Sequence, residues 1–177
     1  MLRYCMIKVK WEINVVILFI VFVLTGCSVL QDNVVYPTNP NEISREDKLR
    51  QEVIAYAKEQ QGASYRYAGR DPRGFDCSGF THYVMKKFDI SLTTSSKTQV
   101  GEGKSIPVKE AKPGDLIFFK RSPTGRVFHV ALVVTNRRNE LKVIHSTSRG
   151  VVIDNLLTSS YWKPKISSAR NVISDSI

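Results

Sequence analysis

The sequence has few cysteines, few histidines and no long apolar run, and each shortage argues against a class of protein. Three of the 177 residues are cysteines and three are histidines, without the paired local spacing of zinc motifs. The longest apolar run, residues 13–24, has twelve residues and is broken only by Asn14, which makes it shorter than a membrane-spanning helix needs. Internal repeats and coiled-coil heptads are also missing. The remaining possibility is one ordinary folded domain behind a short leader.

The first 26 residues have the pattern of a bacterial export signal. Three basic residues precede the apolar run, and Leu24-Thr25-Gly26-Cys27 follows it. These last four residues resemble a lipobox, in which the cysteine is lipid-modified and becomes the mature N-terminus. We therefore expect a lipoprotein signal peptide at 1–26, a lipidated flexible tether at 27–43 and the folded domain at 44–177. A short membrane anchor is the alternative.

The expected lipid implies attachment to the membrane of the cell envelope. The residue after Cys27 is Ser28 rather than Asp, which implies an outer-membrane protein facing the periplasm if the cell is Gram-negative. The chain carries 26 Lys and Arg against 16 Asp and Glu, and the basic residues are dispersed. We expect an anionic envelope polymer as partner and no nucleic acid, with a merely soluble basic surface as the alternative.

Hydrophobic spacing predicts helices in the first half of the domain and strands in the second. Ser44 begins an approximate capping box, and Asp76 precedes a second apolar stripe that starts at Cys77. The turn Pro113-Gly114 separates this half from segments rich in β-branched and aromatic residues. The class is therefore α+β, with helices packed on an antiparallel sheet. The predicted helices are 45–61, 77–88 and a turn near 96–100, and the strands are 116–120, 127–135, 141–147 and 151–154.

Cys77 is the only cysteine that remains once Cys5 leaves with the signal and Cys27 carries lipid. Exported proteins usually pair their thiols, so a solitary one forms an intermolecular bridge or is reactive. Its place at a helix start favours the thiolate, and a neighbouring imidazolium would lower the thiol pKa further. We interpret Cys77 as a catalytic nucleophile with a lowered pKa.

The imidazole that this nucleophile needs is predicted to come from a β-hairpin. A hairpin centred on Arg137 sets His129 directly opposite His145, so that both side chains project from one face. One imidazole would activate sulfur and the other would orient the first. A slip of one residue would separate them. A zinc site on Cys77, His129 and His145 is an alternative.

His82, the third histidine, is not expected to take part. It lies five residues after Cys77 on the same predicted helix. At about 100° per residue, this spacing turns it roughly 140° away from the thiol. We expect His82 at the surface or in an unrelated contact.

These residues stand in motifs that resemble the NlpC-type cell-wall cysteine peptidases. The resemblance covers residues 47–172, and Tyr161-Trp162-Lys163 is similar to the small lipoprotein members. It implies a papain-like fold and hydrolysis of an amide bond in peptidoglycan stem peptides, without a cofactor or metal. The matching motifs are Tyr65-Arg66-Tyr67, Asp76-Cys77-Ser78-Gly79-Phe80, Pro113-Gly114-Asp115-Leu116, His129-Val130-Ala131-Leu132 and His145-Ser146-Thr147.

The resemblance also implies a role for each matched residue. Cys77 becomes the nucleophile, His129 the base and then the acid, and His145 the orienting third residue. Tyr65 corresponds to a tyrosine that helps to form the oxyanion site. The remaining matches, Asp76 and Ser78, correspond to positions that line the substrate cleft, although helix capping explains them nearly as well.

One departure from the family pattern bears on the substrate. Thr93-Thr94-Ser95 stands where relatives commonly carry Pro-Arg followed by Ser or Thr. The bond to be cut therefore stays open between the D-glutamyl–diamino acid bond and the D-alanyl–diamino acid bond. Arg70 and Arg73 lie near the cleft by sequence, and we hypothesise that they bind substrate carboxylates. We expect a monomer, with a thioester-forming acyltransferase or an inactive wall-binding lipoprotein as alternatives.

Overall fold

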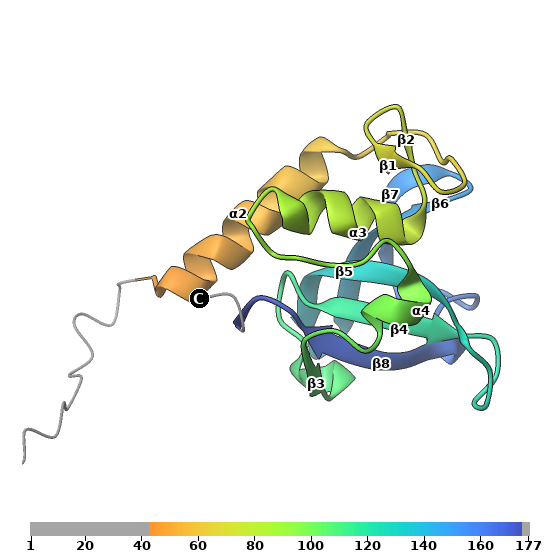
Figure 1. The fold of residues 1–177 in the computed structure, drawn as a ribbon. Helices are drawn as coiled ribbons and strands as arrows, with labels where there is room; N and C mark the ends of the chain where they lie inside the picture. Colours follow the sequence, from red (N-terminus) through yellow and green to blue (C-terminus); the bar gives the residue numbers. More distant parts are fainter. Residues whose placement is uncertain (1–42, 175–177) are drawn as a thin grey trace, which may run out of the picture. The chain divides into compact units, whose positions relative to one another are not determined.

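A six-stranded sheet with helices on one face forms the domain in this computed structural model, which describes residues 43–174 (Figure 1). The expected signal peptide, the lipidated Cys27 and the tether up to residue 42 lie outside the described residues. Within the described part, no helix combines the length and apolar character needed to cross a membrane. The arrangement confirms the α+β class.

Helix α2, Arg45–Glu59, begins as the capping pattern predicts, because the Ser44 hydroxyl accepts a hydrogen bond from the Asp47 N–H at 3.0 Å. Helix α3, Cys77–Lys86, begins at Asp76, whose carboxylate accepts from the Gly79 N–H at 2.6 Å. Asp89, with a left-handed φ of 59°, closes α3 near the predicted end. Both helix starts are therefore set by local side-chain caps.

The sheet is antiparallel throughout, in the order β3-β8-β4-β5-β6-β7. Strands β3 and β8, which extend the sheet beyond β4, were not predicted. The β8 sequence has only two apolar residues, Ile166 and Ala169. Two short strands and the helical turn α4 complete the structure. The bounds are β1 Arg70–Asp71, β2 Gly74–Phe75, α4 Ser96–Gln99, β3 Lys104–Ile106, β4 Leu116–Lys120, β5 Val127–Arg137, β6 Glu140–Thr147, β7 Gly150–Asn155 and β8 Ile166–Asn171, with 3₁₀ turns at Val108–Glu110 and Lys163–Lys165.

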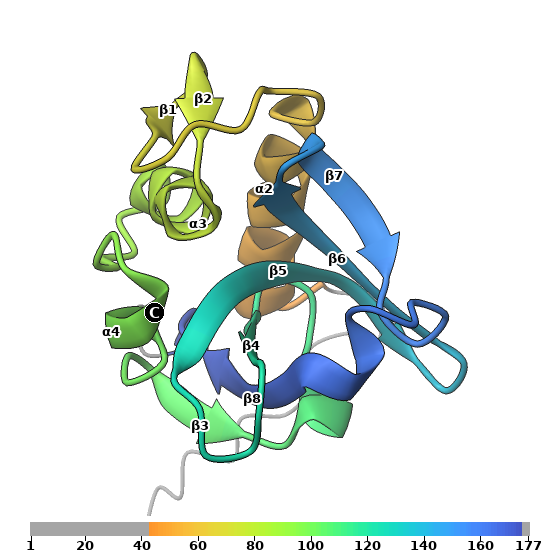
Figure 2. The ribbon, with the colours of Figure 1, turned by 90° about the vertical axis from the view of Figure 1, so that its right-hand side faces the viewer.

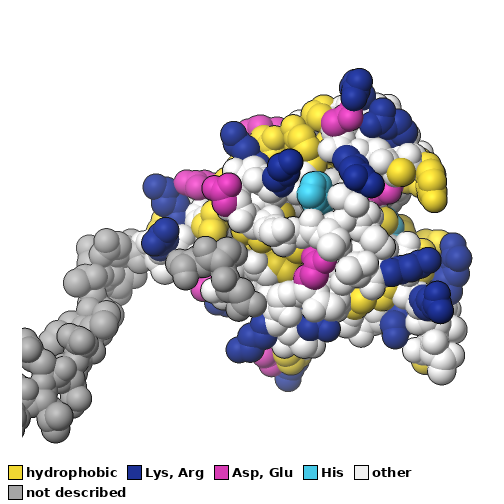
Figure 3. All heavy atoms as spheres, viewed as in Figure 1, with side chains coloured by type: hydrophobic (Ala, Val, Ile, Leu, Met, Phe, Trp, Pro, Cys, Tyr) yellow, Lys and Arg dark blue, Asp and Glu magenta, His cyan; other side chains and the backbone are white. Residues whose placement is uncertain are grey.

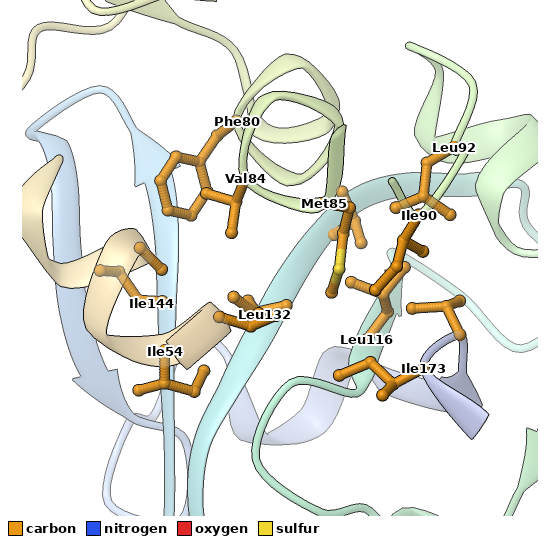
Figure 4. Packing of buried hydrophobic residues seen from close by; sticks show 14 of the residues in the cluster. Ile54, Phe80, Val84, Met85, Ile90, Leu92, Leu116, Leu132, Ile144 and Ile173 are labelled. Carbon is orange, nitrogen blue, oxygen red and sulfur yellow. The ribbon is translucent and has the colours of Figure 1, made fainter. Parts of the chain in front are cut away.

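Both faces of the sheet are buried. Helices α2 and α3 cover one face, as two views of the ribbon show (Figures 1 and 2). There, Phe80 and Val84 of α3 pack toward Leu132 of β5 (Figure 4). The opposite face carries a second cluster that includes Phe119 and is covered in part by Trp162. Burial on both sides explains the nearly continuous apolar sequences of β4 and β5.

The β5–β6 hairpin differs in register from the prediction. Val133 lies opposite Val143, not opposite Leu141, because the turn is only two residues long and β5 carries an extra residue before Thr135. Direct opposition of His129 and His145 is therefore wrong. The shift near the histidines is two residues, however, and an even shift keeps every side chain on its expected face.

The Gly-Asp-Leu motif at the start of β4 has a structural reason. Asp115 is 1% exposed and accepts a 2.8 Å hydrogen bond from the Arg50 guanidinium of α2, which is itself 3% exposed. Arg50 also donates to the Pro113 carbonyl at 2.8 Å. A buried charge needs such partners, so this contact fixes α2 to the sheet.

Candidate active site

Cys77 opens into a cavity of about 830 Å³ at the start of α3. His129 of β5, Tyr65 and Trp162 line the same cavity. Within residues 43–174, Cys77 is a free cysteine and is half-buried. The structure therefore brings together the thiol, the first histidine and the tyrosine that the sequence singled out.

Two close contacts hold the loop before Cys77 in place. The Ser146 hydroxyl of β6 donates to the Phe75 carbonyl at 2.7 Å. Gly79 lies so close to the neighbouring loop that an added Cβ would come within 2.0 Å of the Gly69 carbonyl oxygen. Only glycine permits this approach. The loop that carries Tyr65 is thus packed directly against the first turn of the nucleophile helix.

A chain of hydrogen bonds extends from His129 through the buried His145 to Asp154, which also lines the cavity. His129 Nε2 lies 3.0 Å from His145 Nδ1, and His145 Nε2 lies 3.1 Å from Asp154 Oδ2. This confirms that the two histidines share a face. The Arg149 guanidinium contacts the same Asp154 oxygen. Asp154 was missed by the sequence analysis, although its place two residues beyond Val152, the partner of His145, sets it on the same side of β7.

Aromatic rings enclose the two imidazoles. The Trp162 ring stacks on His129 with 4.6 Å between centroids and 28° between planes. Phe119 packs on the same imidazole. His129 is 7% exposed and His145 is fully buried. This packing restricts ring rotation and removes water from both histidines.

Burial sets the protonation states of the thiol and imidazole. It raises the pKa of Cys77, against the opposing effect of a backbone hydrogen bond from Val130. It also lowers the pKa of His129 to about 3, helped by the neighbouring His145. The prediction of a thiol pKa lowered by an imidazolium is therefore wrong. Desolvation disfavours both charged forms, and the resting pair is a neutral thiol beside a neutral imidazole.

Burial of His145 likewise lowers its pKa, although Asp154 opposes this shift. For Asp154 itself, burial favours the neutral acid, but hydrogen bonds from His145 and Arg149 hold its pKa below the usual range. Asp154 is therefore a carboxylate at neutral pH. It is the anionic end of a chain whose other members are uncharged.

The zinc alternative is not supported by this arrangement. Both ring nitrogens of His145 are taken by protein partners. Among residues 43–174 there is no group of three His, Cys, Asp or Glu side chains placed to hold a metal ion.

The other predicted site residues lie as follows. Tyr65 is 46% exposed on the cavity wall. Its pKa is raised by burial and then by Asp76 and Cys77, so its hydroxyl is protonated at neutral pH. Asp76 and Ser78 are not among the residues that line the cavity, and their contacts favour the helix-capping alternative. Asp76 caps α3. Ser78 is 5% exposed, and its hydroxyl donates to the Thr94 carbonyl at 3.0 Å.

Arg70 and Arg73 do not line the cavity either. Arg73 pairs with Asp71 at 3.0 Å and is 83% exposed. The arginines on the cavity wall are Arg121 and Arg149, which are distant from Cys77 in the sequence. Closeness along the chain was therefore a poor guide to the cleft.

His82 is placed as predicted, away from the cavity. Its Nδ1 lies 2.6 Å from the Leu92 carbonyl, so this nitrogen carries the proton and the contact is structural. His82 is thus a natural control for experiments on the other two histidines.

Comparison with known proteins gives consistent matches. A model of the NlpC/P60 family matches residues 62–171. The probable endopeptidase NlpC of Escherichia coli (strain K12) is 38% identical over 126 residues, 68% of this chain and 79% of the relative. The gamma-DL-glutamyl hydrolase of Bacillus subtilis (strain 168) is 38% identical over 138 residues, 76% of this chain. This chain spans only 32% of that hydrolase and 20% of the probable endopeptidase p60 of Listeria welshimeri.

Solved structures agree with the sequence matches. An NlpC/P60 family protein from Bacillus cereus superposes with a TM-score of 0.64 at 31% identity, over 70% of this chain and 40% of that one. The NlpC/p60 domain of the peptidoglycan hydrolase SagA superposes with a TM-score of 0.57 at 30% identity, over 69% of this chain and 97% of that one. The expected family fold is confirmed.

The neutral resting pair predicts how alkylation of Cys77 depends on pH. Because burial disfavours the thiolate, the alkylation rate should rise with pH through an apparent pKa above that of the unfolded protein, about 8.5. The measurement is the rate of iodoacetamide addition to the Cys77 peptide, followed by mass spectrometry at pH 5 to 10 in native and in denatured protein. A native rate that stays high and constant down to pH 5 would indicate a thiolate–imidazolium pair instead.

Proposed function

The chain belongs to the NlpC/P60 family, and on that premise we propose that it is a cysteine peptidase that hydrolyses an amide bond in peptidoglycan stem peptides. Relatives are named as a probable endopeptidase, a gamma-DL-glutamyl hydrolase and, in Escherichia coli, a murein DD-endopeptidase. These names support peptidoglycan hydrolysis. One name specifies a gamma-glutamyl bond and another a DD bond of murein, so the choice between the D-glutamyl–diamino acid and the D-alanyl–diamino acid bond stays open.

One observation carries the proposal. A free thiol at a helix start shares a cavity with His129, whose Nε2 is held by His145 at 3.0 Å. That contact leaves Nδ1 of His129 available for the thiol proton. A nucleophile, a base and a third group that orients the base are the parts that acyl transfer to a cysteine requires.

In the proposed mechanism, the first half forms a thioester. Cys77 sulfur attacks the stem-peptide carbonyl while its proton moves to His129 Nδ1, because the resting pair is neutral. The carbonyl oxygen becomes an oxyanion. Collapse of this intermediate breaks the carbon–nitrogen bond, and His129 gives its proton to the departing amine.

The second half releases the acyl group. Water loses a proton to His129 and attacks the thioester carbonyl. The carbon–sulfur bond then breaks, and the proton returns to sulfur. The products together contain one added water, and the free thiol is restored.

The oxyanion is assigned to the Cys77 backbone N–H and the Tyr65 hydroxyl. An N–H in the first turn of a helix has no partner within the helix, and the helix dipole favours negative charge there. The raised pKa of Tyr65 keeps its hydroxyl a donor. Loss of one such donor typically raises a barrier by about 3 kcal/mol.

The cavity is suited to an anionic substrate. Arg149 is paired with Asp154, whereas Arg121 has no acidic partner among residues 43–174 and lies over the Phe128 ring at 4.7 Å. One guanidinium on the cavity wall is therefore uncompensated. We assign it to a free carboxylate of the stem peptide.

Basic side chains are scattered over the face of the domain seen in Figure 3 rather than gathered in one patch. This supports an anionic cell-wall substrate over nucleic acid. The lipobox-like residues 24–27 support attachment to the cell envelope by lipid at Cys27, in the outer membrane if the cell is Gram-negative. The protein is assigned as a monomer that needs no cofactor.

Cys77→Ala and His129→Ala should each abolish release of peptides from purified peptidoglycan, because the first removes the nucleophile and the second its base. The measurement is liquid chromatography with mass spectrometry of the soluble fragments. His82→Ala, in a histidine outside the cavity, should retain wild-type turnover. Retained hydrolysis by Cys77→Ala would falsify the assignment, and inactivity of the wild-type protein would favour a wall-binding role.

Arg121→Gln should raise KM for a defined muropeptide about two- to tenfold with little change in kcat, because a hydrogen bond to substrate is worth about 0.5–1.5 kcal/mol. Arg73→Gln is the matched control, since Arg73 is 83% exposed and lies outside the cavity. Equal KM values for both variants and the wild type would remove Arg121 from the substrate site.

A further inference from the structure

Three adjacent strands contribute one residue each to a continuous hydrogen-bonded chain. Asp154 of β7 contacts His145 of β6 at 3.1 Å, and His145 contacts His129 of β5 at 3.0 Å. His145 is completely buried, so both of its ring nitrogens depend on these partners. The chain begins at a carboxylate and ends at the imidazole that shares a cavity with Cys77.

The chemistry of the three groups fixes where each proton lies. A carboxylate only accepts hydrogen bonds, so His145 Nε2 must carry a proton toward Asp154. In a neutral imidazole the other nitrogen, Nδ1, is then an acceptor. His129 Nε2 must donate to it, and His129 Nδ1 is left with a lone pair.

We propose that Asp154 is a positioning residue that sets the tautomers of His145 and His129, so that the base presents an unprotonated Nδ1 to the Cys77 thiol. This assignment deepens the proposed function and rests on it, because the lone pair matters only if Cys77 must lose a proton. No family motif quoted above includes Asp154.

The reverse arrangement shows why the carboxylate is needed. If His145 donated from Nδ1, its Nε2 lone pair would face the Asp154 carboxylate at 3.1 Å, where two acceptors repel. His129 would then accept at Nε2 and carry its proton on Nδ1. That nitrogen could no longer take a proton from sulfur. Without an acceptor at residue 154, neither arrangement is selected.

Arg149 holds the carboxylate in position. Its guanidinium contacts the Asp154 oxygen that faces His145, and its side chain is 59% exposed at the cavity wall. The pair places a compensated charge at the end of the chain. Asp154 thus acts on Cys77 through two imidazoles and needs no contact with the reacting atoms.

The test is the protonation state of each ring nitrogen in the full chain labelled with ¹⁵N-histidine, read from long-range ¹H–¹⁵N correlation spectra. The wild-type protein should show protonated Nε2 and unprotonated Nδ1 at both His129 and His145. Asp154→Ala should shift His129 toward the Nδ1-protonated form. It should also lower kcat about 10- to 100-fold with KM nearly unchanged, by analogy with the loss of the carboxylate partner of a metal-binding histidine.

Two further variants complete the design. Asp154→Glu keeps a carboxylate and should recover part of kcat and of the wild-type tautomer signals. Asp71→Ala is the matched control, because Asp71 also pairs with arginine but lies outside the cavity. It should change neither the histidine spectrum nor kcat.

A wild-type spectrum with a proton on His129 Nδ1 would overturn the proposal, as would an Asp154→Ala variant with unchanged tautomers and kcat. The wild-type spectrum decides the tautomer even if a variant fails to fold. Because it needs no substrate, it also separates this inference from the function. The expected tautomers in a protein that cannot cut peptidoglycan would contradict the proposed function alone.

Discussion

The contact between His129 and His145 is the constraint on which the site depends. His129 Nε2 and His145 Nδ1 lie 3.0 Å apart and satisfy each other, because both rings are buried. The sheet supplies both rings from adjacent strands, and Trp162 stacks on His129 to hold its plane. Helix α3 then needs only to bring Cys77 to the strand end. The site therefore lies where the helical layer packs on the sheet, with Cys77 supplied by α3 and the two histidines by β5 and β6.

The same burial that orders the histidines also determines the electrostatics. It raises the pKa of Cys77 and lowers that of His129, so the resting pair is uncharged. The proton must then move during attack rather than before it. Asp154, an ionised group only 19% exposed, lies at the far end of the chain, where it can stabilise the imidazolium that forms. The charged forms of Cys77 and His129 therefore arise only during attack on the substrate.

Much of the fold followed from local sequence signals. Strand β4 has its predicted bounds, and α2 and α3 begin at their caps, because a short apolar run after a turn and a capping side chain are both local signals. Strand β8 was missed because its polar sequence pairs only through tertiary context. The hairpin register was wrong by two residues, because the turn lies later than predicted and shifts the pairing by three, and the extra residue in β5 takes one of these back. The histidines still met, because an even shift preserves the face.

The catalytic residues of the site could be predicted from the sequence, but their burial and their hydrogen-bond partners could not. Motif and spacing identified Cys77, His129 and His145, but the direction of the thiol pKa depends on burial, which one sequence does not reveal. Asp154 of β7 contacts His145 of the neighbouring strand β6 from a diagonal position, two residues beyond the directly paired Val152. This contact can be recognised only when the strand register is known. Arg121 lines the cavity, whereas the predicted Arg70 and Arg73 do not, because the position of a side chain in the cavity depends on the tertiary fold. The protonation states and the contacts of the site residues are therefore set by the tertiary fold.

Detection of the acyl-enzyme shows directly whether Cys77 is the nucleophile. The protein would be mixed with a defined muropeptide, quenched in acid during turnover and digested for mass spectrometry. We expect a stem-peptide fragment joined as a thioester to the peptide that contains Cys77. Turnover in which Cys77 stays unmodified, and hydrolysis that persists after Cys77 is alkylated, would contradict this role of Cys77.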